Sequence, residues 1–125
     1  MADGEVVLVV DDDLTLRELY AERLKQEGYA VIESDNGEDA IKKAVDQLPA
    51  LIILDIMMPK TNGIDVMTKL RADEKTKGIP IIILTALIQE IDKVKSLMTE
   101  KDAYLIKSEQ MPKDVIEKVN QALAK

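Results

Sequence analysis

Short apolar runs alternate with amphipathic segments along the whole chain. The runs are rich in Val, Ile and Leu, and the segments between them repeat apolar residues every three or four positions. The first pattern predicts buried strands, and the second predicts helices with one apolar face. The predicted strands are Val6–Val10, Ala30–Ile32, Leu51–Leu54, Ile79–Leu84 and Ala103–Ile106. Three of them are almost unbroken in Val, Ile and Leu, which is typical of a parallel sheet covered on both faces.

Five helices are expected between and after these strands. The first is expected to open with a capping box, Thr15-x-x-Glu18, and to end at Gly28, a residue suited to the position after a helix. Asn36 is a good N-cap for the second helix, and Pro112 leads into the last. The apolar positions are Leu16, Leu19, Tyr20 and Leu24; Ala40, Ile41, Ala44, Val45 and Leu48; Ile64, Met67 and Leu70; Ile88, Ile91, Val94 and Met98; and Val115, Ile116, Val119 and Leu123.

The regular alternation of strand and helix predicts an α/β fold. Helices between parallel strands make right-handed crossovers, so we expect a doubly wound parallel sheet of five strands with five helices. The length of 125 residues suits one domain, which we expect to run from residue 1 to residue 125. Ligands of such sheets bind beyond the carboxyl ends of the strands, where the winding direction reverses. The residues that follow each apolar run are therefore the candidates for function.

Composition excludes several kinds of site. The sequence has no cysteine and no histidine, which excludes disulfides, thiolate metal sites and a phosphohistidine on the chain itself. The net charge of −7 argues against a nucleic-acid surface, which needs an excess of Lys and Arg. The apolar runs are far shorter than a membrane span, and the acidic N-terminus lacks a signal-peptide pattern. We therefore expect no nucleic-acid or membrane binding and a cytoplasmic location.

Polar side chains that can carry chemistry follow four of the predicted strands. They are Asp11, Asp12 and Asp13 after the first run, Asp55 after the third, Thr85 after the fourth and Lys107 after the fifth. Each has an ordinary alternative, because a polar residue after a strand often faces water or caps the next helix. That alternative fits Asp13 best, so we expect Asp13 mainly to cap the first helix.

Together these groups predict phosphoryl chemistry. Carboxylates gathered in one crevice repel one another, and a small, hard cation relieves that repulsion. Mg²⁺ takes a few protein oxygens and keeps several waters, which leaves coordination positions for a phosphate. A carboxylate nucleophile, a metal ion, a lysine and a hydroxyl donor are the groups that phosphoryl transfer requires.

In these motifs the sequence resembles a response-regulator receiver domain of two-component signalling, over essentially its whole length. The matching motifs are Val9-Val10-Asp11-Asp12, Asp55-Ile56-Met57-Met58-Pro59-Lys60-Thr61-Asn62-Gly63, Leu84-Thr85-Ala86 and Tyr104-Leu105-Ile106-Lys107. The D-x-x-M-P-x-x-x-G stretch is the most specific of the four. The resemblance implies a flavodoxin-like fold with the strand order 2-1-3-4-5.

The resemblance also implies the roles of the acidic residues. Asp55 would accept a phosphoryl group from the phosphohistidine of a sensor histidine kinase or of a phosphotransfer protein. The Asp12 and Asp55 carboxylates and the Met57 backbone carbonyl would hold Mg²⁺, and Asp11 would act largely through water. Such a domain is a switch that catalyses only its own phosphorylation and dephosphorylation, and it is not an enzyme in the usual sense.

Three more residues would bind the phosphate and transmit the signal. Lys107 would pair with the phosphate, Thr85 would move to hydrogen-bond it, and Tyr104 would rotate into the vacated space. Tyr104 also has an ordinary alternative, which is packing on an edge strand. The output surface would be the face formed by the fourth helix, the fifth strand and the fifth helix, where a downstream effector or a second copy of the chain would bind.

Two other interpretations stay open, and one local departure stands out. Asp11-Asp12-Asp13-Leu14-Thr15 also matches the D-x-D-x-T motif of haloacid-dehalogenase-like phosphatases, although that interpretation leaves Asp55 unexplained. The other is a pseudo-receiver that is never phosphorylated, against which the intact set of site residues argues. Receivers usually have Lys-Pro with a cis peptide where this chain has Lys107-Ser108. We expect a trans peptide there, because a cis bond before serine costs roughly 2.5–4 kcal/mol.

Overall fold

Five parallel strands form one sheet at the centre of the molecule. The computed structural model describes residues 4–58, 61–85, 95–96, 98, 102–106 and 112–123. The strands of the sheet are β1 (Val6–Val10), β2 (Ala30–Ser34), β3 (Leu51–Asp55), β6 (Ile81–Thr85) and β7 (Ala103–Ile106). Their spatial order is β2-β1-β3-β6-β7, and every pair is parallel. Counted along the chain this is the order 2-1-3-4-5, so the predicted sheet is confirmed.

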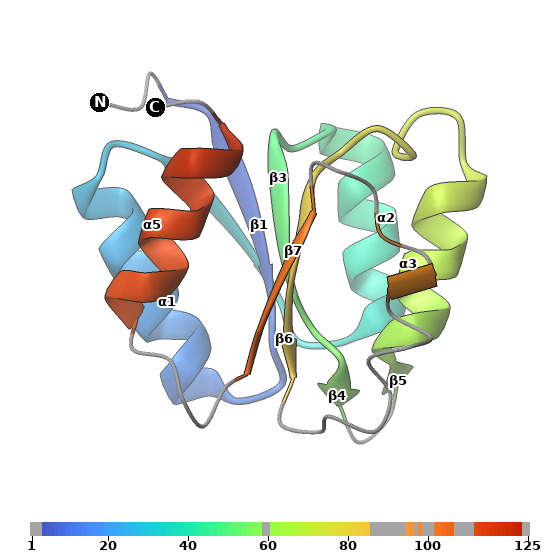
Figure 1. Ribbon diagram of the computed structural model, residues 1–125, viewed down its shortest axis with the longest axis horizontal. Helices are drawn as coiled ribbons and strands as arrows, with labels where there is room; N and C mark the ends of the chain where they lie inside the picture. The colour runs from blue at the N-terminus through green and yellow to red at the C-terminus, as the bar shows by residue number, and fades with distance from the viewer. Residues whose placement is uncertain are drawn as a thin grey trace.

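Helices cover both faces of this sheet (Figure 1). They are α1 (Leu14–Gln26), α2 (Gly37–Gln47), α3 (Gly63–Ala72) and α5 (Pro112–Ala122). Helices α1 and α5 pack side by side on one face, and α2 and α3 on the other. The fourth predicted helix, Ile88 to Met98, falls mostly outside the described residues. In the described part of the chain, no helix is long and apolar enough to span a membrane.

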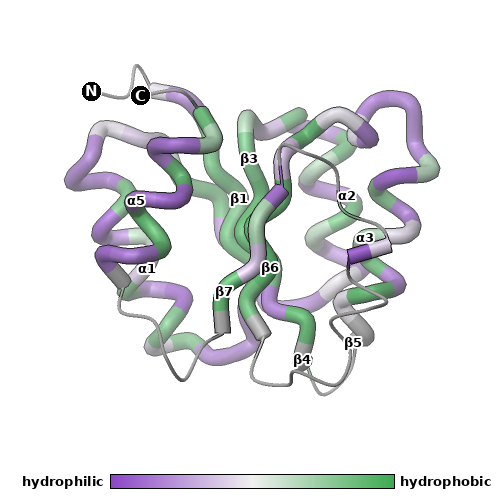
Figure 2. Tube along the Cα trace, in the orientation of Figure 1, coloured by the Kyte–Doolittle hydropathy of each residue, from purple (hydrophilic) through white to green (hydrophobic). Residues whose placement is uncertain are grey.

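Two apolar clusters fill the space between the sheet and its helices. Val7 and Val9 point into the cluster on the α1 and α5 side, whereas Leu8 and Val10 point into the cluster on the α2 and α3 side. Successive residues of a strand face opposite sides of a sheet, so both sets must be apolar when both faces are covered. Figure 2 shows the result as largely apolar traces for β1, β3 and β6, whereas polar and apolar residues alternate along the helices.

The start of α1 corrects one prediction and confirms another. Asp13 is the N-cap, and its Oδ1 accepts a hydrogen bond from the Leu16 N–H at 3.1 Å. The capping box predicted at Thr15 is wrong, because the helix already begins at Leu14. The capping role expected of Asp13 is confirmed. Gly28 also behaves as expected, with a φ of 95° just beyond the helix.

A few predicted strand bounds and core positions are also wrong. Strand β2 continues two residues past Ile32, so Glu33 and Ser34 belong to it. Strand β6 begins at Ile81 and not Ile79, because Pro80 has no N–H to give to the sheet. Leu48 lies after α2 in the left-handed region, at φ 47°. It is 53% exposed and is not part of the apolar face of α2.

Candidate functional site

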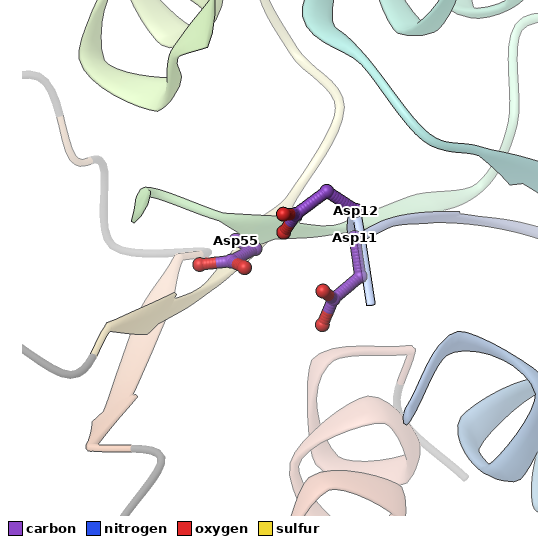
Figure 3. Close-up of side chains that lie close together, drawn as sticks. All are labelled: Asp11, Asp12 and Asp55. Atoms are coloured by element: carbon purple, nitrogen blue, oxygen red, sulfur yellow. The ribbon is translucent and has the colours of Figure 1, made fainter. Parts of the chain in front are cut away.

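Three carboxylates meet at the carboxyl ends of β1 and β3. Ligand oxygens of Asp11, Asp12 and Asp55 all lie within 4.8 Å of one another, and Figure 3 shows the three side chains grouped around a common space. Asp55 is the last residue of β3, and the other two follow β1. The two strands pair in parallel with Val10 opposite Leu54, so the residues after these two emerge next to each other.

The three carboxylates differ in their access to solvent. Asp11 and Asp55 are 0% and 1% exposed, whereas Asp12 is exposed. Burial of a charged carboxylate is costly unless hydrogen bonds or an opposite charge compensate it. A set of ligands made only of carboxylate oxygens, with one exposed member, suits a hard cation such as Mg²⁺ that keeps part of its water. The exposed side of Asp12 leaves the site open to ions.

The backbone around Asp11 is held by several hydrogen bonds. Its N–H donates to the Ser34 carbonyl of the neighbouring strand at 3.1 Å. Its Oδ1 accepts from the Asp13 N–H at 2.9 Å. Its carbonyl oxygen accepts from Nη1 of Arg17 at 2.8 Å. These contacts fix both the carboxylate of Asp11 and the turn that carries Asp12.

Arg17 and Glu33 are parts of this site that the sequence did not reveal. Nε of Arg17 lies 3.2 Å from Oε1 of Glu33, which follows β2's apolar residues. Nζ of Lys43 in turn donates to the Glu33 carbonyl oxygen at 2.6 Å. Only the position of Arg17 in the sequence could have indicated its role. It stands four residues after the N-cap of α1, where a side chain can reach back to the strand ends.

The chain leaves Asp55 through a small hairpin that the sequence analysis did not predict. It consists of β4 (Met57–Met58) and β5 (Thr61–Asn62), paired antiparallel. The Ile56 N–H donates to the Leu84 carbonyl at 2.9 Å, so the ladder between β3 and β6 continues one residue past Asp55. Met58 is buried in the cluster on the α2 and α3 side, where it anchors the hairpin to the core.

The structure explains why the most specific motif ends in a glycine, Gly63. Its N–H donates to the Ile56 carbonyl at 3.1 Å and closes the hairpin onto the end of β3. A Cβ added at Gly63 would lie 2.5 Å from the Ile56 Cα and 2.9 Å from the Asp55 carbonyl oxygen. Both are backbone atoms that cannot rotate away. Only glycine allows α3 to begin this close to Asp55.

We therefore expect Gly63→Ala to lower the free energy of unfolding by about 1–3 kcal/mol, the usual cost of an added methyl group in a tightly packed place. Urea unfolding would measure it. Gly78→Ala is the matched control, because no atom lies within 4 Å of a Cβ added there. Equal stabilities of the two variants would show that the backbone near Ile56 yields easily and that this contact does not matter.

The remaining predicted site residues are only partly placed. Thr85 is the last residue of β6, whose Leu84 pairs with Asp55, so its backbone lies one position beyond that pair. Tyr104 lies in β7, half-buried against the α2 and α3 cluster. Nζ of Lys95 lies 5.7 Å from the centroid of its ring. Lys107 and its bond to Ser108 lie outside the described residues.

Comparisons with known proteins identify relatives over most of the chain. A family model for the response regulator receiver domain matches residues 7–120. The chain is 41% identical over 104 residues to the phosphate regulon transcriptional regulatory protein PhoB of Pseudomonas aeruginosa. This alignment covers 83% of this chain and 45% of PhoB. It is 38% identical over 117 residues to the transcriptional regulatory protein ResD of Bacillus subtilis, covering 94% and 47% of the two chains. The chain thus spans just under half the length of these relatives.

Solved structures show the same fold over nearly the full length. A putative response regulator from Chloroflexus aurantiacus has a TM-score of 0.86 and 28% identity, covering 98% of this chain and 99% of that one. The chemotaxis response regulator CheY4 of Vibrio cholerae has a TM-score of 0.84 and 25% identity, covering 94% and 98%. The similarity therefore includes the sheet, its helices and the strand ends that carry the acidic cluster.

Proposed function

The chain belongs to the response regulator receiver family of two-component signalling, and from this premise we propose that Asp55 is its phosphoacceptor. The observation that carries the proposal is the position of the Asp55 carboxylate, at the end of β3 and within 4.8 Å of ligand oxygens of Asp11 and Asp12. The family match argues against the phosphatase interpretation. The presence of all three carboxylates argues against a pseudo-receiver.

The reaction is the transfer of a phosphoryl group to Asp55. A carboxylate oxygen of Asp55 attacks the phosphorus of the donor, and a new O–P bond forms as the bond from phosphorus to the donor breaks. The donor is the phosphohistidine of a sensor kinase or of a phosphotransfer protein, and its imidazole leaves with the electron pair. The product is the domain with its Asp55 carboxylate converted into an acyl phosphate, and later hydrolysis by water restores the carboxylate and releases inorganic phosphate.

Mg²⁺ is the cofactor that the acidic cluster is suited to hold. The Asp12 and Asp55 carboxylates and the Met57 carbonyl are the proposed ligands, with Asp11 acting through water. When bound, Mg²⁺ supplies positive charge that offsets the repulsion among the carboxylates and stabilises the phosphoryl oxygens during transfer. Asp11 contributes by its burial and hydrogen bonds, since these hold the turn after β1 in one position.

Phosphate on Asp55 is proposed to act on the edge of the sheet formed by β6 and β7. Lys107 would pair with the phosphate, Thr85 would donate a hydrogen bond to it, and Tyr104 would then turn inward. The output surface would include β7 and α5, where an effector or a second copy binds. Hydrogen exchange with and without beryllofluoride would test this. Protection is expected in β7 and α5, and changes confined to α1 would contradict it.

Incubation with acetyl phosphate tests the proposed function directly. With Mg²⁺ we expect intact-mass spectrometry to show one phosphoryl adduct per chain, and with excess EDTA none, because the metal is needed for transfer. A phosphatase would release phosphate repeatedly from a generic ester and keep no adduct. Absence of an adduct in the presence of Mg²⁺ would favour the pseudo-receiver. A single domain over residues 1–125 and a cytoplasmic location stay predictions.

A further inference from the structure

We propose that Arg17 is a positioning residue of the phosphorylation site. Its side chain joins the turn after β1 to the end of β2, and in this way it holds the Asp11 and Asp12 carboxylates in the positions that Mg²⁺ binding requires. The inference rests on the proposed function, since it takes Asp11, Asp12 and Asp55 as the metal site. It adds a residue that contacts neither the metal nor the phosphate and acts through the backbone.

The contacts of Arg17 join two neighbouring strand ends to α1. Nη1 donates to the Asp11 carbonyl oxygen at 2.8 Å, and Nε donates to Oε1 of Glu33 at 3.2 Å. The Arg17 side chain is only 14% exposed, and that of Glu33 is 34% exposed. Burial at this level limits the screening that makes most surface ion pairs weak.

The carbonyl oxygen that Arg17 binds lies in the peptide plane between the two metal-site residues. A planar peptide fixes the Cα atoms on either side of it relative to its oxygen. Holding the Asp11 oxygen therefore holds the Cα of Asp12 as well as that of Asp11. The exposed Asp12 side chain has little packing of its own to define its position, so the backbone must do so.

The guanidinium is suited to this clamp, and a lysine is not. Its N–H groups are fixed in one plane, so a donor to Asp11 and a donor to Glu33 are held at a constant relative position. Glu33 is itself anchored from α2, because Nζ of Lys43 donates to its carbonyl oxygen at 2.6 Å and pairs with Asp39 at 2.9 Å. Arg17 thus joins the turn after β1 to Glu33, whose own position is held by α2.

The sign of the effect on Mg²⁺ affinity separates positioning from simple charge. If Arg17 acted only as a nearby positive charge, its removal would reduce repulsion of the cation and tighten Mg²⁺ binding. If it positions the carboxylates, its removal weakens Mg²⁺ binding. Loss of a group that orients metal ligands typically lowers metal affinity by 10–100-fold, so we expect roughly tenfold.

Isothermal titration of the full chain with Mg²⁺ alone tests the proposal, without any phosphodonor. We expect Arg17→Ala and Arg17→Lys both to weaken Mg²⁺ binding roughly tenfold. Lys keeps the positive charge, but like Ala it lacks the N–H groups held in one plane that contact Asp11 and Glu33 together. Asp12→Ala, which removes a ligand, is the reference for a damaged site. Arg23→Ala is the matched control: it removes the same charge from the same helix about 9 Å further along, and it should leave the affinity unchanged.

Glu33 provides a second test, which remains decisive if Arg17→Ala does not fold. Glu33→Gln keeps an oxygen that accepts from Nε, and Glu33→Leu does not. We expect Gln to retain the affinity within about twofold and Leu to weaken it as Arg17→Lys does. Equal losses in the two Glu33 variants, or unchanged or tighter binding in Arg17→Ala, would overturn the inference. Absence of Mg²⁺ binding in the unmodified chain would instead contradict the proposed metal site.

Discussion

Asp55→Asn is expected to abolish the phosphoryl adduct completely while the fold stays intact. The amide of Asn has nearly the shape of the carboxylate but has no anionic oxygen to attack phosphorus. Asp55 is 1% exposed and close to two other carboxylates, so the substitution also removes one charge from a repelling cluster. We therefore expect the free energy of unfolding without Mg²⁺ to be unchanged or higher.

The measurement is intact-mass spectrometry after incubation with acetyl phosphate and Mg²⁺, beside a urea unfolding curve. Asp13→Asn is the matched control, because it makes the same chemical change at the residue next to Asp12, outside the set of proposed ligands. Asn caps helices about as well as Asp, so this variant should keep both its stability and the adduct. An adduct on Asp55→Asn would place the nucleophile elsewhere, with Asp11 as the first candidate.

The sequence was sufficient to predict the sheet and the acidic cluster, because both follow from general properties of a parallel sheet covered on both faces. A strand covered on both faces must be apolar at every position, so such strands stand out in the sequence as unbroken runs of apolar residues. Parallel strands all end at one edge, so Asp12 and Asp55 could be expected to meet there although they stand 43 positions apart in the printed chain. Neither inference required knowledge of any side-chain contact.

What the sequence did not predict depends on contacts between distant side chains and on local competition. Arg17 stands four residues after the N-cap of α1, a position that allows a contact with the strand ends but does not by itself identify the Asp11 carbonyl as its partner. Thr15 and Asp13 both suit an N-cap, and the pattern alone favoured the box beginning at Thr15. In the structure Asp13 takes that position, because the turn after β1 already directs its side chain to the Leu16 N–H.

Asp102 has a structural role that the sequence patterns did not predict. In the structure, Oδ1 of Asp102 accepts from the Ile81 N–H at 2.6 Å, and its Oδ2 pairs with Nη2 of Arg71. The acid therefore joins the beginnings of β6 and β7 to the end of α3, at the opposite end of the sheet from Asp55.

The surroundings of this pair are almost closed to water. The side chain of Asp102 is 0% exposed and that of Arg71 is 13% exposed. Nη1 of Arg71 also donates to the carbonyl oxygens of Lys77 and Ile79, at 2.8 and 2.9 Å. Loss of the acid would remove this counter-charge from a largely buried guanidinium, and it would remove the acceptor of the first N–H of β6.

We therefore expect Asp102→Ala to lower the free energy of unfolding by about 3–5 kcal/mol, the usual cost of removing one partner of a buried ion pair. Against the 5–15 kcal/mol typical of a whole domain, this is a large fraction. Glu74→Ala is the control, because the Glu74–Lys77 pair, at 2.8 Å, has side chains that are 85% and 55% exposed. That substitution should change stability by less than about 1 kcal/mol.

Urea unfolding of Asp102→Ala, Asp102→Asn and Arg71→Met/Asp102→Ala separates the two contributions of Asp102. Asn keeps an acceptor for the Ile81 N–H and loses only the charge, so its loss should be intermediate. The double variant also removes the buried cation that has lost this acid, and it should be more stable than Asp102→Ala alone. A loss below about 1 kcal/mol in Asp102→Ala would mean that water reaches the pair and screens it.

Because Asp102 lies at the end of the sheet away from Asp55, folded Asp102→Ala should still form the phosphoryl adduct. That result would distinguish a structural role of Asp102 from a role in phosphorylation.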